Sequence, residues 1–161
     1  RGLDLKSSAF YSMLPFIAMA VCSPFGGWIA DMLTKRYGAR VGRCGIGVAG
    51  MAGAAVFIAL ATQVESARLA SVVLACGIGM QYLCQSCYWA VTADVAGSSA
   101  GSVSGFMNMG GQIGGATTAI LTPIIAASLG WTASFLAPAL LCAVGALLWL
   151  FVNPGVRLES K

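Results

Sequence analysis

The chain alternates between long uncharged stretches and short charged segments. The uncharged stretches are Ser7–Ala30, Cys44–Val64, Leu69–Ala93 and Val95–Val156. A helix needs about 20 mostly apolar residues to cross the roughly 30 Å hydrocarbon layer of a bilayer. Each of the first three stretches therefore predicts one membrane-spanning helix, and the last is long enough for two.

The last stretch has a natural dividing point at Leu129-Gly130-Trp131-Thr132, where a glycine break precedes an interfacial tryptophan. The pattern therefore predicts an all-α membrane protein with five transmembrane helices. We expect residues 1–7 to form an external loop and residues 155–161 a cytoplasmic tail. The predicted spans are approximately 8–30, 44–63, 69–93, 101–128 and 132–152.

Composition supports a membrane protein and argues against an enzyme. Hydrophobic residues make up 58% of the chain and charged residues 9%, against about 25% charged in a soluble domain. Histidine is absent, which excludes imidazole catalysis and His-ligated metals. No Ser/His or paired-carboxylate arrangement is present, and Cys84 and Cys87 match C-x-x-C without a βαβ pattern. We expect no catalytic residues, no cofactor and no metal site.

The basic residues predict the orientation. Lys and Arg gather in loops on the cytoplasmic side of membrane proteins. Four of them crowd the loop between the first two spans: Lys35, Arg36, Arg40 and Arg43. Arg157 and Lys161 fall on the same side after five crossings. We therefore expect an external N-terminus and a cytoplasmic C-terminus in a cell membrane, the inner membrane if the source is bacterial. Because the chain begins with Arg1, we also expect it to be a fragment of a longer protein.

Polar residues concentrate in the first, third and fourth spans, which predicts that these spans line an aqueous cavity. The third span carries a stripe at helical spacing, made of Tyr82, Gln85, Ser86 and Trp89. The fourth carries a comparable stripe, made of Gly101, Gly105, Asn108 and Gln112. The alternative is that these groups bond neighbouring helices without touching a ligand. Glycines four residues apart, such as Gly110 and Gly114, favour close helix packing.

The segment Gly26-Gly27-Trp28-Ile29-Ala30-Asp31, followed by Lys35-Arg36-Tyr37-Gly38-Ala39-Arg40, resembles the cytoplasmic loop motif of the major facilitator superfamily. Trp89 to Asp94, then Ala100 to Asn108 with Gly114, Gly115 and Pro123, resemble helices 10 and 11 of its anion:cation symporter branch. The resemblance implies the C-terminal half of a twelve-helix carrier, with the five spans as helices 8–12. Helices 2–6 would give the same order of polar and plain spans, so that order alone does not choose the half.

The same resemblance implies secondary active symport of an organic anion, such as a sugar acid, with protons by alternating access. It places Ser86, Trp89 and Asn108 in contact with substrate, to which the stripes add Gln85, Tyr82 and Gln112. It assigns a conformational motif to the cytoplasmic ends, formed by Gly27, Asp31, Arg36, Gly38, Arg40 and Asp94. The implied partners are the lipid bilayer, a small organic anion, a co-transported proton and the N-terminal half of the same protein, with no nucleic acid.

No Lys or Arg falls inside a predicted span, and Asp31 and Asp94 lie at span ends. We therefore expect the carboxylate anchor and the proton carrier in the N-terminal half. Asp94, at the hydrated membrane edge, favours a structural cap or gate over proton coupling. Two alternatives stay open: a carrier of the same superfamily for drugs or neutral sugars, and a non-transport membrane subunit or sensor.

Overall fold

The structure is a computed structural model that describes the backbone of residues 5–156 and the side chains of residues 9–156. Within the described chain every regular element is helical. Three helical stretches are long and apolar enough to cross a membrane, at Ala9–Tyr37, Arg40–Gln63 and Ala67–Trp149. The last of them is interrupted at Cys84 and at Gly130. The elements in order are α1 (Leu5–Tyr37), the π-helix η1 (Arg40–Cys44), α2 (Gly45–Gln63), α3 (Ala67–Leu83), α4 (Gln85–Ala96), the 3-10 turn η2 (Gly97–Ser99) and α5 (Ala100–Trp149).

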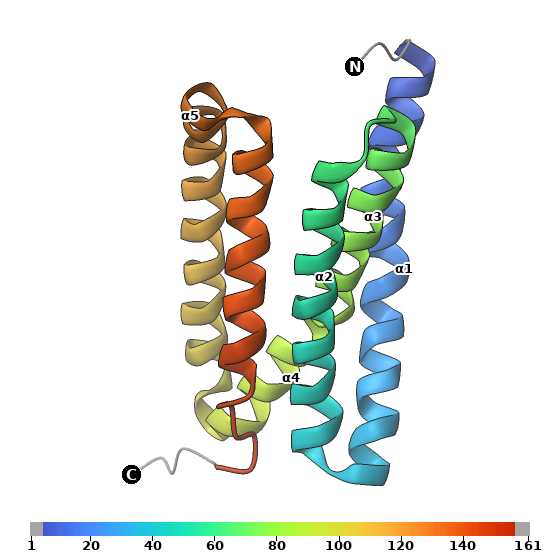
Figure 1. Cartoon of the computed structure of the whole chain (residues 1–161). Coiled ribbons are helices and arrows are strands. Elements are labelled where there is room, and N and C mark those ends of the chain that lie inside the picture. The colour runs from blue at the N-terminus through green and yellow to red at the C-terminus, as the bar shows by residue number, and fades with distance from the viewer. Residues whose placement is uncertain (1–4, 157–161) are drawn as a thin grey trace.

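Helix α5 folds back on itself at Gly130, where the sequence predicts a break. Gly130 has φ 86° and ψ 166°, a conformation that glycine adopts at little cost because it has no Cβ. Residues 100–129 form a first segment and residues 131–149 an antiparallel second segment (Figure 1). The hydroxyl of Ser134 donates to the carbonyl oxygen of Thr122 at 2.9 Å and joins the two segments.

Helix α1 extends beyond its predicted span of 8–30 at both ends. Residues 5–7, predicted as an external loop, are helical, and the helix continues through the charged residues to Tyr37. Charge marks the membrane edge but does not stop a helix, since Lys and Arg are good helix formers. The stop comes at Gly38, whose φ is 87° and whose N–H donates to the Thr34 carbonyl at 2.9 Å. Arg1, Arg157 and Lys161 lie outside the described residues.

The helices form two groups (Figure 1). Helix α3 packs against both α1 and α2, the two segments of α5 lie on the other side, and α4 crosses between them at one end. The second segment of α5 contacts α2, where Gly47 lies against the indole of Trp149. The described part of the chain begins and finishes at opposite ends of the bundle (Figure 1).

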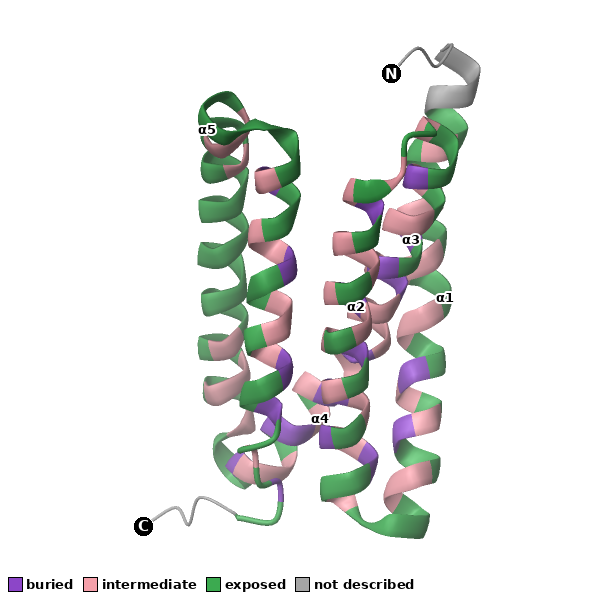
Figure 2. Ribbon diagram, viewed as in Figure 1, coloured by how far each residue is buried: buried purple, intermediate pink, exposed green. Residues whose placement is uncertain are grey.

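Small residues set the spacing of α1, α2 and α3. Gly26 of α1 lies against the backbone carbonyl of Leu83, and Gly50 of α2 lies against the carbonyl of Met80. A side chain at either glycine would collide with backbone, which cannot rotate away. Buried positions accordingly line the facing sides of these helices (Figure 2). This is the small-residue packing expected of helices in a membrane.

We expect Gly26→Ala to lower the free energy of unfolding by about 1–3 kcal/mol, since overpacking forces the backbone to shift. The collision is with Leu83 of α3, so α1 and α3 would separate. The measurement is the thermal transition of the detergent-solubilised full-length protein. Gly45→Ala is the matched control, because an added Cβ there meets nothing within 4 Å. Equal transitions for the two variants would contradict the close contact.

Candidate functional site

The predicted stripe on the third span crosses a break in the helix. Helix α3 ends at Leu83 and α4 begins at Gln85, with Cys84 between them at φ −88° and ψ −5°. The N–H of Cys87 donates to the Cys84 carbonyl at 3.0 Å, which starts the new helix. Tyr82 therefore belongs to a different helix from the other three residues of the stripe. The helical spacing assumed from the sequence does not hold across this junction.

Ser86 faces helix α1 rather than an open surface. A Cβ added to Gly27 would lie 3.4 Å from both the Cβ and the Oγ of Ser86. The Oγ is buried and has no hydrogen-bond partner in the described chain. Gly27 permits this close approach because it has no side chain of its own. Ser86 and Gly27, predicted to serve substrate binding and conformational change, meet in one helix contact.

Trp89 and Asn108 lie on two segments that the structure brings together. The hydroxyl of Thr92 on α4 lies 3.2 Å from the sulfur of Met107 on α5, joining the two helices. Trp89 precedes Thr92 by three residues and is 42% exposed, and Asn108 directly follows Met107 and is exposed. An indole and a side-chain amide therefore remain available close to this contact.

The middle turns of the first segment of α5 are exposed on every side of the helix. Every residue from 108 to 121 is exposed, including Gln112 (Figure 2). The hydroxyls of Thr117 and Thr118 donate to carbonyls of their own helix at 2.8 Å. An added Cβ would meet nothing within 4 Å at any glycine of this segment: Gly101, Gly105, Gly110, Gly111, Gly114 and Gly115. The close packing predicted for these glycines is not made within the described chain.

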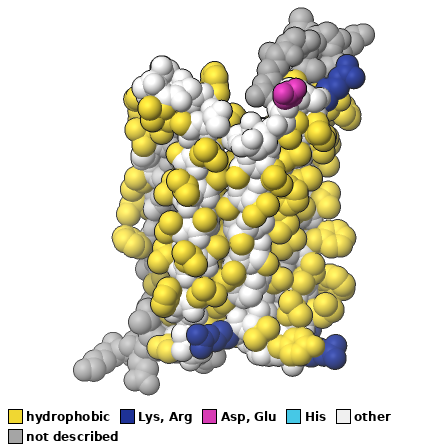
Figure 3. Space-filling model, viewed as in Figure 1, with side chains coloured by type: hydrophobic (Ala, Val, Ile, Leu, Met, Phe, Trp, Pro, Cys, Tyr) yellow, Lys and Arg dark blue, Asp and Glu magenta, His cyan; other side chains and the backbone are white. Residues whose placement is uncertain are grey.

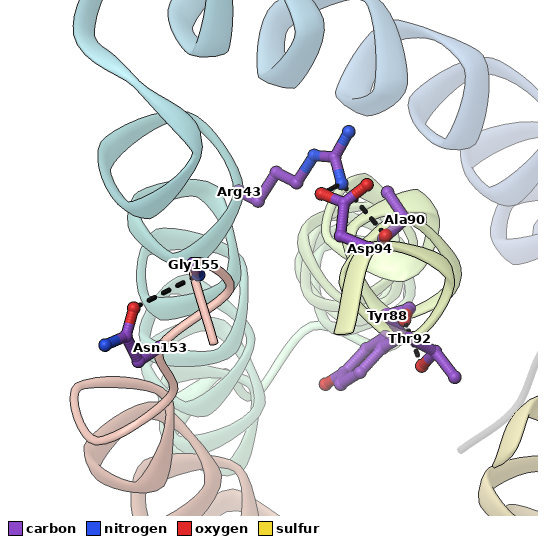
Figure 4. Close-up of polar contacts among 7 residues, drawn as sticks. All are labelled: Arg43, Tyr88, Ala90, Thr92, Asp94, Asn153 and Gly155. Carbon is purple, nitrogen blue, oxygen red and sulfur yellow. Dashed lines mark hydrogen bonds and ion pairs between the residues drawn. The ribbon is translucent and has the colours of Figure 1, made fainter. Parts of the chain in front are cut away.

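An ion pair between Arg43 and Asp94 joins η1 to α4 (Figure 4). The same guanidinium nitrogen, Nη1, also donates to the carbonyl of Ala90 at 2.9 Å. The Arg43 side chain is 16% exposed and that of Asp94 is 36% exposed. Asp94 therefore links α4 to the start of the second span.

Arg43 is the functional candidate that sequence reasoning missed. The sequence pattern groups Arg43 only with the basic residues that predict the orientation, together with Lys35, Arg36 and Arg40. The signal was present, since Arg43 and Asp94 are opposite charges at span ends on the same predicted side. The sequence does not show which of the four basic residues pairs with Asp94. That depends on the π-helix and on the buried Gly42, which place η1 close to Thr34 of α1.

The other residues of the predicted conformational motif lie at the surface. Asp31, Arg36 and Arg40 are exposed, and Gly38 provides the positive φ that ends α1. The guanidinium of Arg36 lies 5.3 Å from the centre of the Tyr37 ring, within cation–π range.

Two cavities lie elsewhere in the bundle, and none of the six predicted substrate-binding residues lines either. One of about 480 Å³ lies where α2 ends and α3 begins, beside Trp131 and Phe135. The other, of about 370 Å³, lies between α2, α4 and both segments of α5, against Tyr88 and Trp149. In this cavity the Tyr88 hydroxyl lies 3.0 Å from the sulfur of Met51. Of the predicted substrate residues, three are exposed and two are half-buried, whereas Ser86 faces α1. The exposed ones are Trp89, Asn108 and Gln112, and the half-buried ones are Tyr82 and Gln85.

Long apolar helices with charges confined to their ends define a multi-pass membrane protein. The profile of the Major Facilitator Superfamily matches residues 12–161, and the chain belongs to that family.

Several curated proteins that are similar in sequence to this chain are named as transporters. A "probable sulfoacetate transporter" of Cupriavidus necator is 32% identical over 99% of the chain and 38% of its own length. A hexuronate transporter of Bacillus subtilis is 32% identical over 75% of the chain and 31% of its own length. A chloroplastic ascorbate transporter of Arabidopsis thaliana is 28% identical over 96% of the chain and 29% of its own length. The chain thus spans about a third of the length of these relatives.

Proposed function

We propose that this chain is the C-terminal part of a carrier that moves a small organic anion with protons by alternating access. Its five crossings would be α1, η1 with α2, α3 with α4, and the two segments of α5, corresponding to helices 8–12 of the twelve-helix fold. The basic connection after α1 would lie in the cytoplasm of a cell in whose membrane the carrier resides.

The observation that carries this proposal is the set of neutral polar groups left open on α4 and α5. Trp89 on α4 and Asn108 and Gln112 on α5 are exposed. Such groups are costly to leave facing lipid, and they suit a solute-lined pathway closed by other helices of the carrier. We infer that they donate hydrogen bonds to oxygens of the substrate, with the Trp89 indole packing against it.

The relatives' names support an anionic substrate, since sulfoacetate, hexuronate and ascorbate all carry acidic groups. The charged residues of this chain stand at helix ends, where Arg43 is already paired with Asp94. The cation that holds the anion and the group that carries the proton would therefore come from the N-terminal half. This division of roles is what a site between two rocking halves requires.

The test uses the full-length protein in proteoliposomes. We expect uptake of radiolabelled hexuronate or sulfoacetate when the outside is acidified, and loss of that uptake when a protonophore collapses the gradient. If the protein takes up glucose or a cationic drug but neither acid, it is a carrier for another class of solute and the proposal is wrong. Absence of any uptake by correctly inserted protein would favour a non-transport role.

A further inference from the structure

Three cations are held together at one end of the bundle by a very short connection. Helix α1 ends at Tyr37 and η1 begins at Arg40, with only Gly38 and Ala39 between them. Lys35 and Arg36 in the last turn of α1, and Arg40 at the start of η1, are all exposed. Basic side chains gather at this end of the molecule, on either side of hydrophobic ones (Figure 3). Gly38, which has a positive φ, makes the turn between the two elements.

These cations are free to bind an external group. Arg43, the fourth basic residue of the connection, is neutralised by Asp94. The other three form no ion pair within the described residues. Asp31, exposed on α1, is the one carboxylate that the described parts of α1 and η1 carry. Three cations against one acid leave a net positive surface at the membrane edge.

An exposed apolar face of α1 leads directly to this positive surface. Val21, Phe25, Trp28 and Met32 are 50%, 58%, 63% and 49% exposed, and their spacing places them on one side of the helix. Lys35 continues the same side, two turns after Trp28, or about 10 Å along the axis at 1.5 Å per residue. Hydrophobic side chains cover the corresponding side of the molecule above its basic end (Figure 3).

We propose that this surface binds an anionic phospholipid of the adjoining leaflet. The phosphate lies on Lys35, Arg36 and Arg40, and an acyl chain lies along the Trp28 face of α1. A lipid with net negative charge is attracted to a basic cluster at the membrane surface, whereas a zwitterionic lipid is not. The short connection through Gly38 and Ala39 favours binding, because little loop freedom remains to be lost.

The test measures lipids retained by the full-length carrier, purified in detergent from mixed phosphatidylglycerol and phosphatidylcholine, by native mass spectrometry. We expect the triple variant Lys35→Gln/Arg36→Gln/Arg40→Gln to retain at least about fivefold less phosphatidylglycerol, with phosphatidylcholine unchanged. Arg68→Gln is the matched control, because it removes an exposed cation at the start of α3. Equal retention by the triple variant and the control overturns the proposal.

A second measurement leaves the cations in place and so does not depend on how the triple variant inserts. A photo-crosslinking amino acid at position 28 is activated in vesicles of the same two lipids. We expect adducts with phosphatidylglycerol in excess of its share of the bilayer. Adducts in proportion to lipid composition would show that this face is ordinary lipid-exposed surface. Crosslinks to another part of the protein would show that it is a protein interface. Either result overturns the proposal.

Discussion

Asp94→Asn is expected to lower proton-driven uptake and substrate exchange together, by about tenfold or more. The change leaves the Arg43 guanidinium, 16% exposed, with the Ala90 carbonyl but without its carboxylate. Removing one partner of a fully buried pair costs about 3–5 kcal/mol. Because this pair is partly hydrated, we expect Asp94→Asn to lower the free energy of unfolding by about 2 kcal/mol. The readouts are both transport modes in proteoliposomes and the thermal transition of the purified carrier.

The reverse truncation provides the control. Arg43→Gln leaves Asp94, whose side chain is 36% exposed and can be hydrated. We therefore expect Arg43→Gln to shift the thermal transition less than Asp94→Asn, and the exchange variant Arg43→Asp/Asp94→Arg to recover part of the loss. Loss of proton-driven uptake with exchange intact in Asp94→Asn would instead assign proton coupling to Asp94.

Asn108→Ala is expected to lower kcat/KM for the transported anion by about 10- to 100-fold, the effect of losing a hydrogen bond to a charged group worth about 1.5–3 kcal/mol. Asn108 is exposed on the first segment of α5, next to the Met107 contact with α4. No packing within the described chain depends on its side chain, so membrane insertion and the thermal transition should not change.

Thr117→Val is the matched control on the same helix. Its hydroxyl already donates to the Ile113 carbonyl at 2.8 Å and is not needed for a substrate. Valine keeps the shape of threonine, so uptake by this variant should stay within about twofold of wild type. If Asn108→Ala transports as well as Thr117→Val, Asn108 does not belong to the substrate site.

The candidate site was only partly accessible from the sequence. The sequence identifies the third and fourth spans as polar, and Trp89 and Asn108 are exposed residues on two neighbouring helices. Ser86 could not be placed, because its direction depends on the helix break at Cys84 and on the gap left by Gly27. Helical spacing is reliable only while the hydrogen-bond ladder is continuous, and residue pattern alone did not reveal this interruption.

Hydrophobicity and charge in the sequence were sufficient to establish a helical membrane protein and a turn at Gly130. Lipid forces each backbone polar group to bond within its own helix, so long apolar runs have little other choice of structure. The pairing of Arg43 with Asp94, the contact of Ser86 with α1 and the openness of α5 were decided only by the tertiary structure. These depend on the distance and rotation between helices, which the shapes of facing residues set and no single segment encodes.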